Sequence, residues 1–388
     1  MSQDMTIPVR RVIAVALFLC LTFARVSPAS EYLGNNQRTG YTDARVPAEP
    51  VLLWTYKERH APKTAWPEPF GELQFIDFDY SDQVTIGDGT AYFGSSADHT
   101  VRALDVGSGE ERWTFYTEGP VRFAPVLYRD RLYVVSDDGH LYCLKASDGS
   151  LIWRRRLAPG SQRCLGNEQM VSKWPCRSGV LIEGDKLYAT AGMWSGDGVV
   201  IYCLSAETGE VIWQNDTTGY RWMLLPHGSG YGGVSPQGYL ALYKDTLYVA
   251  AGRSAPAIFD AKTGELLFHE IGLGYKAHYP GGSWLMAAHD WVMFKRQHNY
   301  RDADVKHTEY QIGGNAEGII LYNYRTGNPE IALVGGRVVA AAVEDDLILG
   351  GAGSRTRRET CSGGSGSRMK YWRTRRLSWN ISATTAMQ

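Results

Sequence analysis

The sequence lacks the usual signatures of redox and metal proteins. Its six cysteines form no Cys-x-x-Cys and no Cys-x-x-Cys-His, and His-Glu-x-x-His is also missing, so the common zinc, haem and metalloprotease spacings are absent. No apolar run reaches the roughly 20 residues of a membrane-spanning helix. Basic and acidic residues nearly balance, 40 against 41, which gives no whole-chain reason to expect nucleic-acid binding.

Glycine, tyrosine and tryptophan are plentiful, with 43, 23 and 12 residues among 388. Glycine favours tight turns, and tyrosine and tryptophan favour strands. Hydrophobic residues make up 44% of the chain, enough for a sizeable core, so a disordered or fibrous protein is excluded. The composition predicts a globular all-β protein.

The N-terminus predicts export. Arg10 and Arg11 precede an apolar run over 12–24, and Ser27-Pro28-Ala29 places small residues where a signal peptidase cuts. The run is too short for a membrane anchor, and bulky residues before Cys20 disfavour a lipid anchor. We interpret residues 1–29 as a cleaved signal peptide and expect a periplasmic or otherwise extracytoplasmic protein with no transmembrane span in the mature chain.

Five cysteines remain after this signal, so at least one thiol is unpaired within the chain. Cys164 and Cys176 flank one irregular segment and are the predicted disulfide for an oxidising compartment. Cys143 and Cys203 fall at matching positions of an internal repeat.

That repeat is the strongest pattern in the chain. Residues 103–113 read Ala-Leu-Asp-Val-Gly-Ser-Gly-Glu-Glu-Arg-Trp, and similar segments follow at 143–153, 203–213, 258–268 and 321–331. Each combines an apolar strand, a turn whose glycine can take positive φ, and a second strand with a large apolar residue. Each copy is therefore a predicted hairpin. A second hairpin precedes most copies, as at 124–135, 180–188 and 239–249.

The repeat glycines Gly109, Gly149, Gly209, Gly264 and Gly327 lie 40, 60, 55 and 63 residues apart, which indicates a 40-residue unit with insertions. Four strands in about 40 residues is typical of a β-propeller blade. We predict an all-β propeller of four-stranded antiparallel blades, six of them recognisable.

The pattern A-x-D-x-x-[ST]-G-x-x-x-W, complete from Ala103 to Trp113, resembles the docking repeat of the PQQ-like (pyrroloquinoline-quinone) propellers. Residues 34–40 and 52–54 are similar to that family's opening segment. The resemblance covers about 31–354 and implies an eight-bladed ring whose last-strand aromatics wedge between blades. The implied blade-docking residues are Trp54, Asp105, Gly109, Trp113, Gly149, Trp153, Gly209, Trp213, Gly264, Phe268 and Gly327.

The C-terminal end departs from the pattern. Residues 338–349 predict an opening hairpin whose blade Trp54 would complete from the N-terminus, but no further repeat follows. Residues 355–388 hold seven arginines, one lysine and one glutamate, a net +7, with no strand alternation. Either six blades close with a disordered basic tail, or the propeller is truncated; the abrupt change favours truncation.

The long insertions, at 58–83, 154–178, 214–237, 269–283 and 295–318, all fall on one face of the predicted propeller. Long loops on a rigid scaffold commonly carry binding sites. We call this face the long-loop face and predict ligand-binding residues at its channel mouth: Arg122, Trp174, Arg177, His227, Gln237 and Trp284. Asp77, Asp79 and Asp82 are weak Ca²⁺ candidates; a solvated acidic loop is the simpler interpretation.

Three hypotheses follow. The first is an exported, monomeric, non-catalytic propeller without cofactor or nucleic acid that binds a protein, peptide or polymer, similar in architecture to the propeller lipoprotein of outer-membrane assembly. The second is a quinoprotein dehydrogenase of alcohols or sugars with PQQ and calcium. The resemblance implies adjacent cysteines for such enzymes, and this chain has none. The third is the docking half of a longer enzyme.

Overall fold

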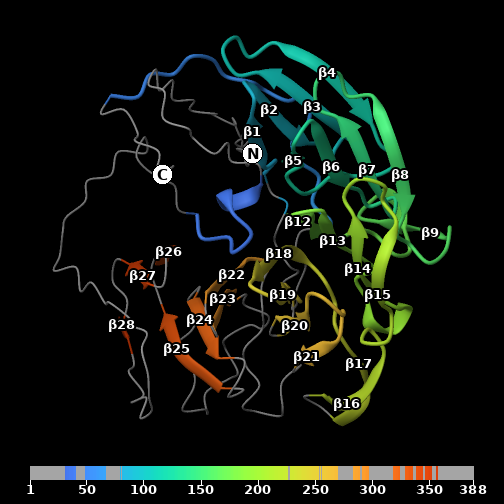
Figure 1. Ribbon diagram of the computed structural model, residues 1–388, viewed down its shortest axis with the longest axis vertical. Helices are drawn as coiled ribbons and strands as arrows, with labels where there is room; N and C mark the ends of the chain where they lie inside the picture. Colours follow the sequence, from blue (N-terminus) through green and yellow to red (C-terminus); the bar gives the residue numbers. More distant parts are fainter. Residues whose placement is uncertain are drawn as a thin grey trace, which may run out of the picture.

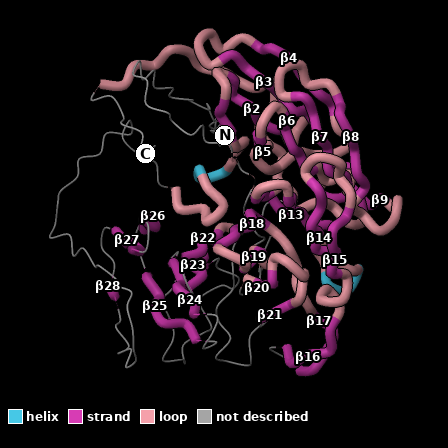
Figure 2. Tube along the Cα trace, viewed as in Figure 1, coloured by secondary structure: helices cyan, strands magenta, loops and turns pink. Residues whose placement is uncertain are grey.

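The computed structural model describes residues 31–40, 49–66, 79, 81–225, 228–252, 254, 256–269, 283–288, 291–296, 318–323, 328–334, 338–343, 346–351 and 355–356, with most side chains up to residue 293. Its regular structure is almost entirely β (Figures 1 and 2). The two helices are single 3-10 turns, η1 (Tyr32–Gly34) and η2 (Ser195–Asp197), so no helix in this part of the chain is long enough to span a bilayer.

Three sheets are four-stranded and antiparallel, with strands in chain order. Blade 1 contains β1 (Val84–Gly87), β2 (Thr90–Gly94), β3 (Thr100–Asp105) and β4 (Glu111–Tyr116). Blade 2 contains β5 (Val126–Tyr128), β6 (Arg131–Val135), β7 (His140–Lys145) and β8 (Leu151–Arg156). Blade 3 contains β12 (Leu181–Glu183), β13 (Lys186–Ala191), β14 (Val200–Ser205) and β15 (Val211–Asn215).

Two further blades have a fifth strand. Blade 4 contains β18 (Gly238–Tyr243), β19 (Thr246–Val249), β20 (Ala257–Asp260) and β21 (Leu266–Phe268), with β11 (Ser178–Gly179) parallel to β18. Blade 5 contains β22 (Leu285–Ala288), β23 (Trp291–Arg296), β24 (Gly318–Asn323) and β25 (Asn328–Val334), and β28 (Arg355–Thr356) pairs with β25.

The blades follow one another around an arc in Figure 1, and the predicted all-β propeller architecture is confirmed. The predicted hairpin at 338–349 is β26 (Val338–Val343) and β27 (Asp346–Gly351), which form a separate two-stranded sheet. The signal peptide, Gly327 and residues 357–388 lie outside the described residues.

The core lies between blades because each sheet packs face to face on the next. One apolar cluster joins blades 2 and 3 and includes Tyr133, Leu141, Leu187 and Tyr202, all less than a tenth exposed. Equivalent clusters join blade 1 to 2, blade 3 to 4 and blade 4 to 5. Every blade therefore depends on its neighbours for burial.

The repeat tryptophans join successive blades in one recurring way. Trp113 Nε1 donates to the Ala146 carbonyl of the next blade at 3.0 Å, and its ring lies against Gly149. Trp54, Trp153 and Trp213 make the same donation, to Val106, Glu207 and Ala261, at 2.8, 2.9 and 3.1 Å. Gly109, Gly209 and Gly264 receive these rings as Gly149 does, so the glycine also provides space for the preceding blade's tryptophan.

A second inter-blade bond recurs on tyrosines of the second strand. Tyr92, Tyr133 and Tyr188 donate from their hydroxyls to Ala146, Ala206 and Ala261 at 3.2, 2.8 and 3.1 Å. The Ala146 and Ala261 carbonyls thus each accept from one tryptophan and one tyrosine of the preceding blade. The turn residue Asp105 accepts from the backbone amides of Gly107 and Ser108, both at 2.8 Å, and holds the hairpin turn beside Val106, the acceptor of Trp54.

The segment 31–40 bridges the innermost strands of blades 3 to 5. Arg38 is fully buried; its Nε donates to Leu240 O at 2.8 Å, and its Nη1 pairs with Glu31 at 2.8 Å. The Ala287 amide donates to Gln37 O at 3.0 Å. Arg38 therefore ties the start of the described chain to the centre of the propeller.

The expected disulfide is not formed, because Cys164 and Cys176 are both free. Cys164 lies exposed on β9 (Arg163–Gly166), which forms a two-stranded ribbon with β10 (Gln169–Ser172). Cys176 is only 1% exposed and packs in the cluster between blades 2 and 3. The two thiols thus belong to different layers of the protein.

We expect the buried His269, which directly follows β21, to make the stability of the folded protein depend on pH. Its Nε2 lies 3.1 Å from Ser254 Oγ, and burial, helped by the Arg221 charge, lowers its pKa from 6.5 to about 4. Between these values the unfolded chain binds a proton that the folded chain does not. The His269 contribution to stability is therefore expected to fall by about 3 kcal/mol as the pH drops from 6.5 to 4, whereas Glu58, whose pKa is raised to about 8, contributes in the opposite direction.

The measurement is urea unfolding at several pH values with His269→Gln and, as an exposed control, His60→Gln. We expect His269→Gln to lose about 3 kcal/mol less stability than the wild type over this pH window, and His60→Gln to follow the wild type. An unchanged slope in His269→Gln would contradict the assignment.

Candidate functional site

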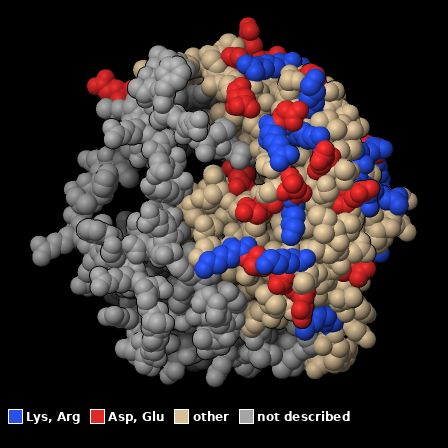
Figure 3. Space-filling model, in the orientation of Figure 1, with Lys and Arg blue, Asp and Glu red and all other residues tan. Residues whose placement is uncertain are grey.

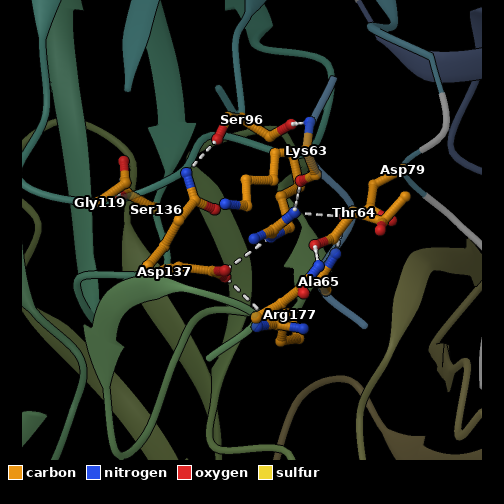
Figure 4. Close-up of polar contacts among 12 residues, drawn as sticks. Lys63, Thr64, Ala65, Asp79, Ser96, Gly119, Ser136, Asp137 and Arg177 are labelled. Atoms are coloured by element: carbon orange, nitrogen blue, oxygen red, sulfur yellow. Dashed lines mark hydrogen bonds and ion pairs between the residues drawn. The ribbon is translucent and has the colours of Figure 1, made fainter. Parts of the chain in front are cut away.

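The candidate site is a buried charge network on the long-loop face. Arg122 precedes β5 and Asp137 follows β6, so both come from blade 2, and Arg177 comes from the segment before β11, the added strand of blade 4. Arg122 Nε donates to Asp137 Oδ2 at 2.6 Å, and Arg177 Nε donates to Asp137 Oδ1 at 2.7 Å (Figure 4). Arg122 is 5% exposed, and Asp137 and Arg177 are 1% exposed.

Asp79, from the first insertion, completes the network by pairing with Arg122 Nη1. Burial disfavours the charged guanidinium, but Asp137 and Asp79 outweigh it and raise the pKa of Arg122. Burial lowers the pKa of Arg177, an effect that Asp137 opposes, and burial raises the pKa of Asp79, an effect that the arginines oppose. Two cations thus face two carboxyl groups, which allows all four to be buried together.

Residues 61–66, which we call the strap, cross this network. Arg122 Nη1 donates to Lys63 O at 2.6 Å, and the Ala65 amide donates to Asp79 Oδ2 at 2.7 Å. Ser96 Oγ accepts from the Lys63 amide at 2.9 Å (Figure 4). The mouth is therefore occupied by the chain itself.

The structure brings only some predicted mouth residues together. Gln237, 2% exposed, accepts from Trp66 Nε1 at 3.3 Å, so it joins the network through the strap. Trp174 instead donates from Nε1 to Asp197 O at 2.6 Å beside η2. Trp284 is half-buried at the start of β22, and His227 lies outside the described residues.

Sequence reasoning missed Asp137, Ser96 and the strap. Asp137 had a usable signal, because two arginines assigned to one buried mouth require a counter-charge and Asp137 follows a predicted strand. The strap had none, since its six residues show no strand or helix pattern.

The weak calcium candidates occupy different networks. Asp79 pairs with Arg122, whereas Asp82 contacts Glu58, and Asp77 lies outside the described residues. Burial and the neighbouring Asp82 raise the pKa of Glu58 to about 8, while Arg102 Nη1 lies 2.9 Å from Glu58. Among the residues with described positions, no group of three or more His, Cys, Asp or Glu is placed to hold a metal ion.

Known proteins agree with this architecture. Residues 97–271 match the PQQ_2 family, described as outer membrane protein assembly factor BamB. This part of the chain is similar to the PQQ-like propellers. No curated protein sequence matches the chain.

Three solved structures align with the chain at low identity. A europium-containing methanol dehydrogenase aligns with TM-score 0.50 and 13% identity, over 80% of this propeller chain and 58% of the dehydrogenase. BamB from Moraxella catarrhalis aligns with TM-score 0.44 and 15% identity, over 71% of each chain. The quinohemoprotein alcohol dehydrogenase from Comamonas testosteroni aligns with TM-score 0.45 and 15% identity, over 82% of this chain and 49% of the enzyme.

PQQ, the cofactor of the dehydrogenase hypothesis, is a flat tricarboxylate, so a propeller that binds it needs available cations and an open aromatic surface. Here Arg122 and Arg177 are bonded to Asp137, and the strap crosses the mouth. The described residues of the mouth therefore do not fit this cofactor, and we derive no chemistry through it.

Proposed function

We propose that this PQQ-like propeller is an exported, non-catalytic binding protein that uses its long-loop face to hold a protein or peptide partner. Export is inferred from the predicted signal peptide and agrees with the family description, which names an outer-membrane assembly factor. The charges buried at the mouth neutralise one another, which favours a structural role for them over catalysis.

The observation that carries the proposal is a pair of projecting ribbons. On the ribbon β9–β10, Leu165 and its register partner Met170 are exposed to solvent, by 72% and 50%. The same holds on the ribbon of β16 (Arg221–Leu225) and β17 (Gly228–Gly232) for the register partners Trp222 and Tyr231, 66% and 55% exposed. Exposed apolar and aromatic groups on projecting elements are typical of protein interfaces.

Charge on the molecular surface agrees with a protein partner rather than nucleic acid. Figure 3 shows basic and acidic side chains interspersed over the described blades instead of a field of one sign. The ion pairs Arg129–Asp185 and Lys262–Asp245 are examples of this mixing. Nucleic-acid binding depends on clustered positive charge, so this surface does not favour it.

Site-specific photo-crosslinking of the full chain in its native envelope tests the proposal. A crosslinker at Leu165 or Trp222 is expected to give discrete adducts with the same partner, whereas one at Lys244, in the short β18–β19 turn of the opposite face, is expected to give none. Equal labelling from all three positions, or none from the ribbons, would overturn it. Reduction of a dye by the protein with PQQ, Ca²⁺ and an alcohol would instead support the dehydrogenase alternative.

A further inference from the structure

Hydrogen bonds from side chains elsewhere in the protein bind the backbone of the strap, as in many complexes of a protein with a peptide. None of residues 61–66 belongs to a strand, yet the backbone groups of Lys63, Thr64 and Ala65 are paired with side chains from other parts of the chain, the Ala65 amide with Asp79. The Lys63 amide donates to Ser96 Oγ at 2.9 Å, Arg122 donates to Lys63 O at 2.6 Å, and Asn167 Nδ2 donates to Thr64 O at 2.7 Å. Loop backbone is more often satisfied by its own turns or by water.

The side chains that bind the strap backbone come from separate parts of the long-loop face. Ser96 follows β2, Arg122 precedes β5, and Asn167 forms the tip of the β9–β10 ribbon with positive φ. Gln169 of the same ribbon donates to Ser96 O at 2.9 Å, which fixes the ribbon tip over blade 1. The scaffold therefore positions these three side chains, and each of them contacts the backbone of the strap.

The strap's side chains add a second level of recognition. Ala65 is 4% exposed, so its position admits only a small residue. Trp66 lies edge-on to Trp194, with ring centroids 5.5 Å apart. Lys63 pairs with the exposed Glu168 at 2.8 Å, a contact of little energy. The recognised pattern is thus an irregular segment, bent at Ala65 and Trp66, with a basic residue, a polar residue, a small residue and an aromatic residue in that order.

One hydrogen-bond donor beside the strap has no acceptor among the described residues. Arg122 is 5% exposed, and this donor is its Nη2. A buried donor without an acceptor costs roughly 1 to 3 kcal/mol, so a peptide that offered one more acceptor would bind better than the strap does.

We propose that these side chains form a peptide-binding site in which the strap is the resident occupant, and that the protein's partner carries a peptide segment of the same pattern that replaces it. The inference rests on the proposed function and specifies the partner. Because the strap is covalently attached, its high effective concentration keeps the site closed to weak competitors.

The test measures binding of a fluorescent peptide with the sequence of residues 59–67 to the full chain. One variant replaces residues 61–66 by Gly-Ser-Gly-Ser-Gly-Ser, and a second, Ala65→Arg, expels the strap without changing its length. We expect both to bind the peptide at least tenfold more tightly than the wild type. Binding should be lost when the peptide itself carries arginine in place of alanine at the small position, and weakened when Asn167→Ala is added to the protein.

A folded variant that does not take up the peptide at millimolar concentration would overturn the proposal. Failure of both variants to fold would also overturn it, because the strap would then be part of the core rather than an exchangeable occupant. The photo-crosslinks from Leu165 and Trp222 do not depend on this peptide, so the loss of one result leaves the other measurable.

Discussion

Gly149→Ala is expected to destabilise the protein by about 2–5 kcal/mol. Gly149 has φ +71°, and an added Cβ would lie 2.6 Å from Cε3 of Trp113. The substitution forces an alanine into the left-handed region and pushes the tryptophan away from its Ala146 acceptor. Because blades 1 and 2 share one apolar cluster, loss of this contact should lower the stability of both. Urea unfolding followed by tryptophan fluorescence measures the change.

Gly184→Ala is the matched control. Gly184 also has positive φ, +58°, and also sits in a hairpin turn, but an added Cβ meets nothing within 4 Å. Gly184→Ala should lower the free energy of unfolding only by the penalty for placing alanine in the left-handed conformation, about 1–2 kcal/mol. Equal losses in the two variants would show that backbone conformation alone, and not tryptophan docking, explains the repeat glycine.

Asp137→Asn is expected to cost about 3–5 kcal/mol, because it removes the counter-charge shared by two buried arginines. Arg122 and Arg177 each donate to Asp137 through Nε, and all three side chains are at most 2% exposed. The amide of asparagine can accept from only one of them and would turn a donor toward the other. Chemical unfolding with and without added salt is the measurement.

Asp185→Asn provides the comparison, since the Arg129–Asp185 pair has side chains 63% and 78% exposed. An exposed pair of this kind contributes about 0–1 kcal/mol and weakens in salt. A loss in Asp137→Asn no greater than in Asp185→Asn would mean that the mouth network does not hold the blades together. It would also remove the fixed frame on which the peptide-binding site depends.

The blades could be predicted from the sequence alone because the residues that define each hairpin are close together in the chain. The turn glycine, the tryptophan four residues later and the strand between them lie within eleven residues, so their spacing is visible in one dimension. The face of the propeller that carries the long insertions also followed from the order of strands and turns.

Only the tertiary structure decided how the mouth is used. Asp137 and Arg177 are 40 residues apart in the chain, and Thr64 and Asn167 are 103 apart, yet each pair is in hydrogen-bonding contact. The tyrosine hydroxyls that join successive blades, and the separation of Cys164 from Cys176, also depend on how sheets stack. The contacts at the mouth form between loops whose residues obey no repeat. Their geometry is set by the packed blades, and their chemistry by whichever polar groups are buried together.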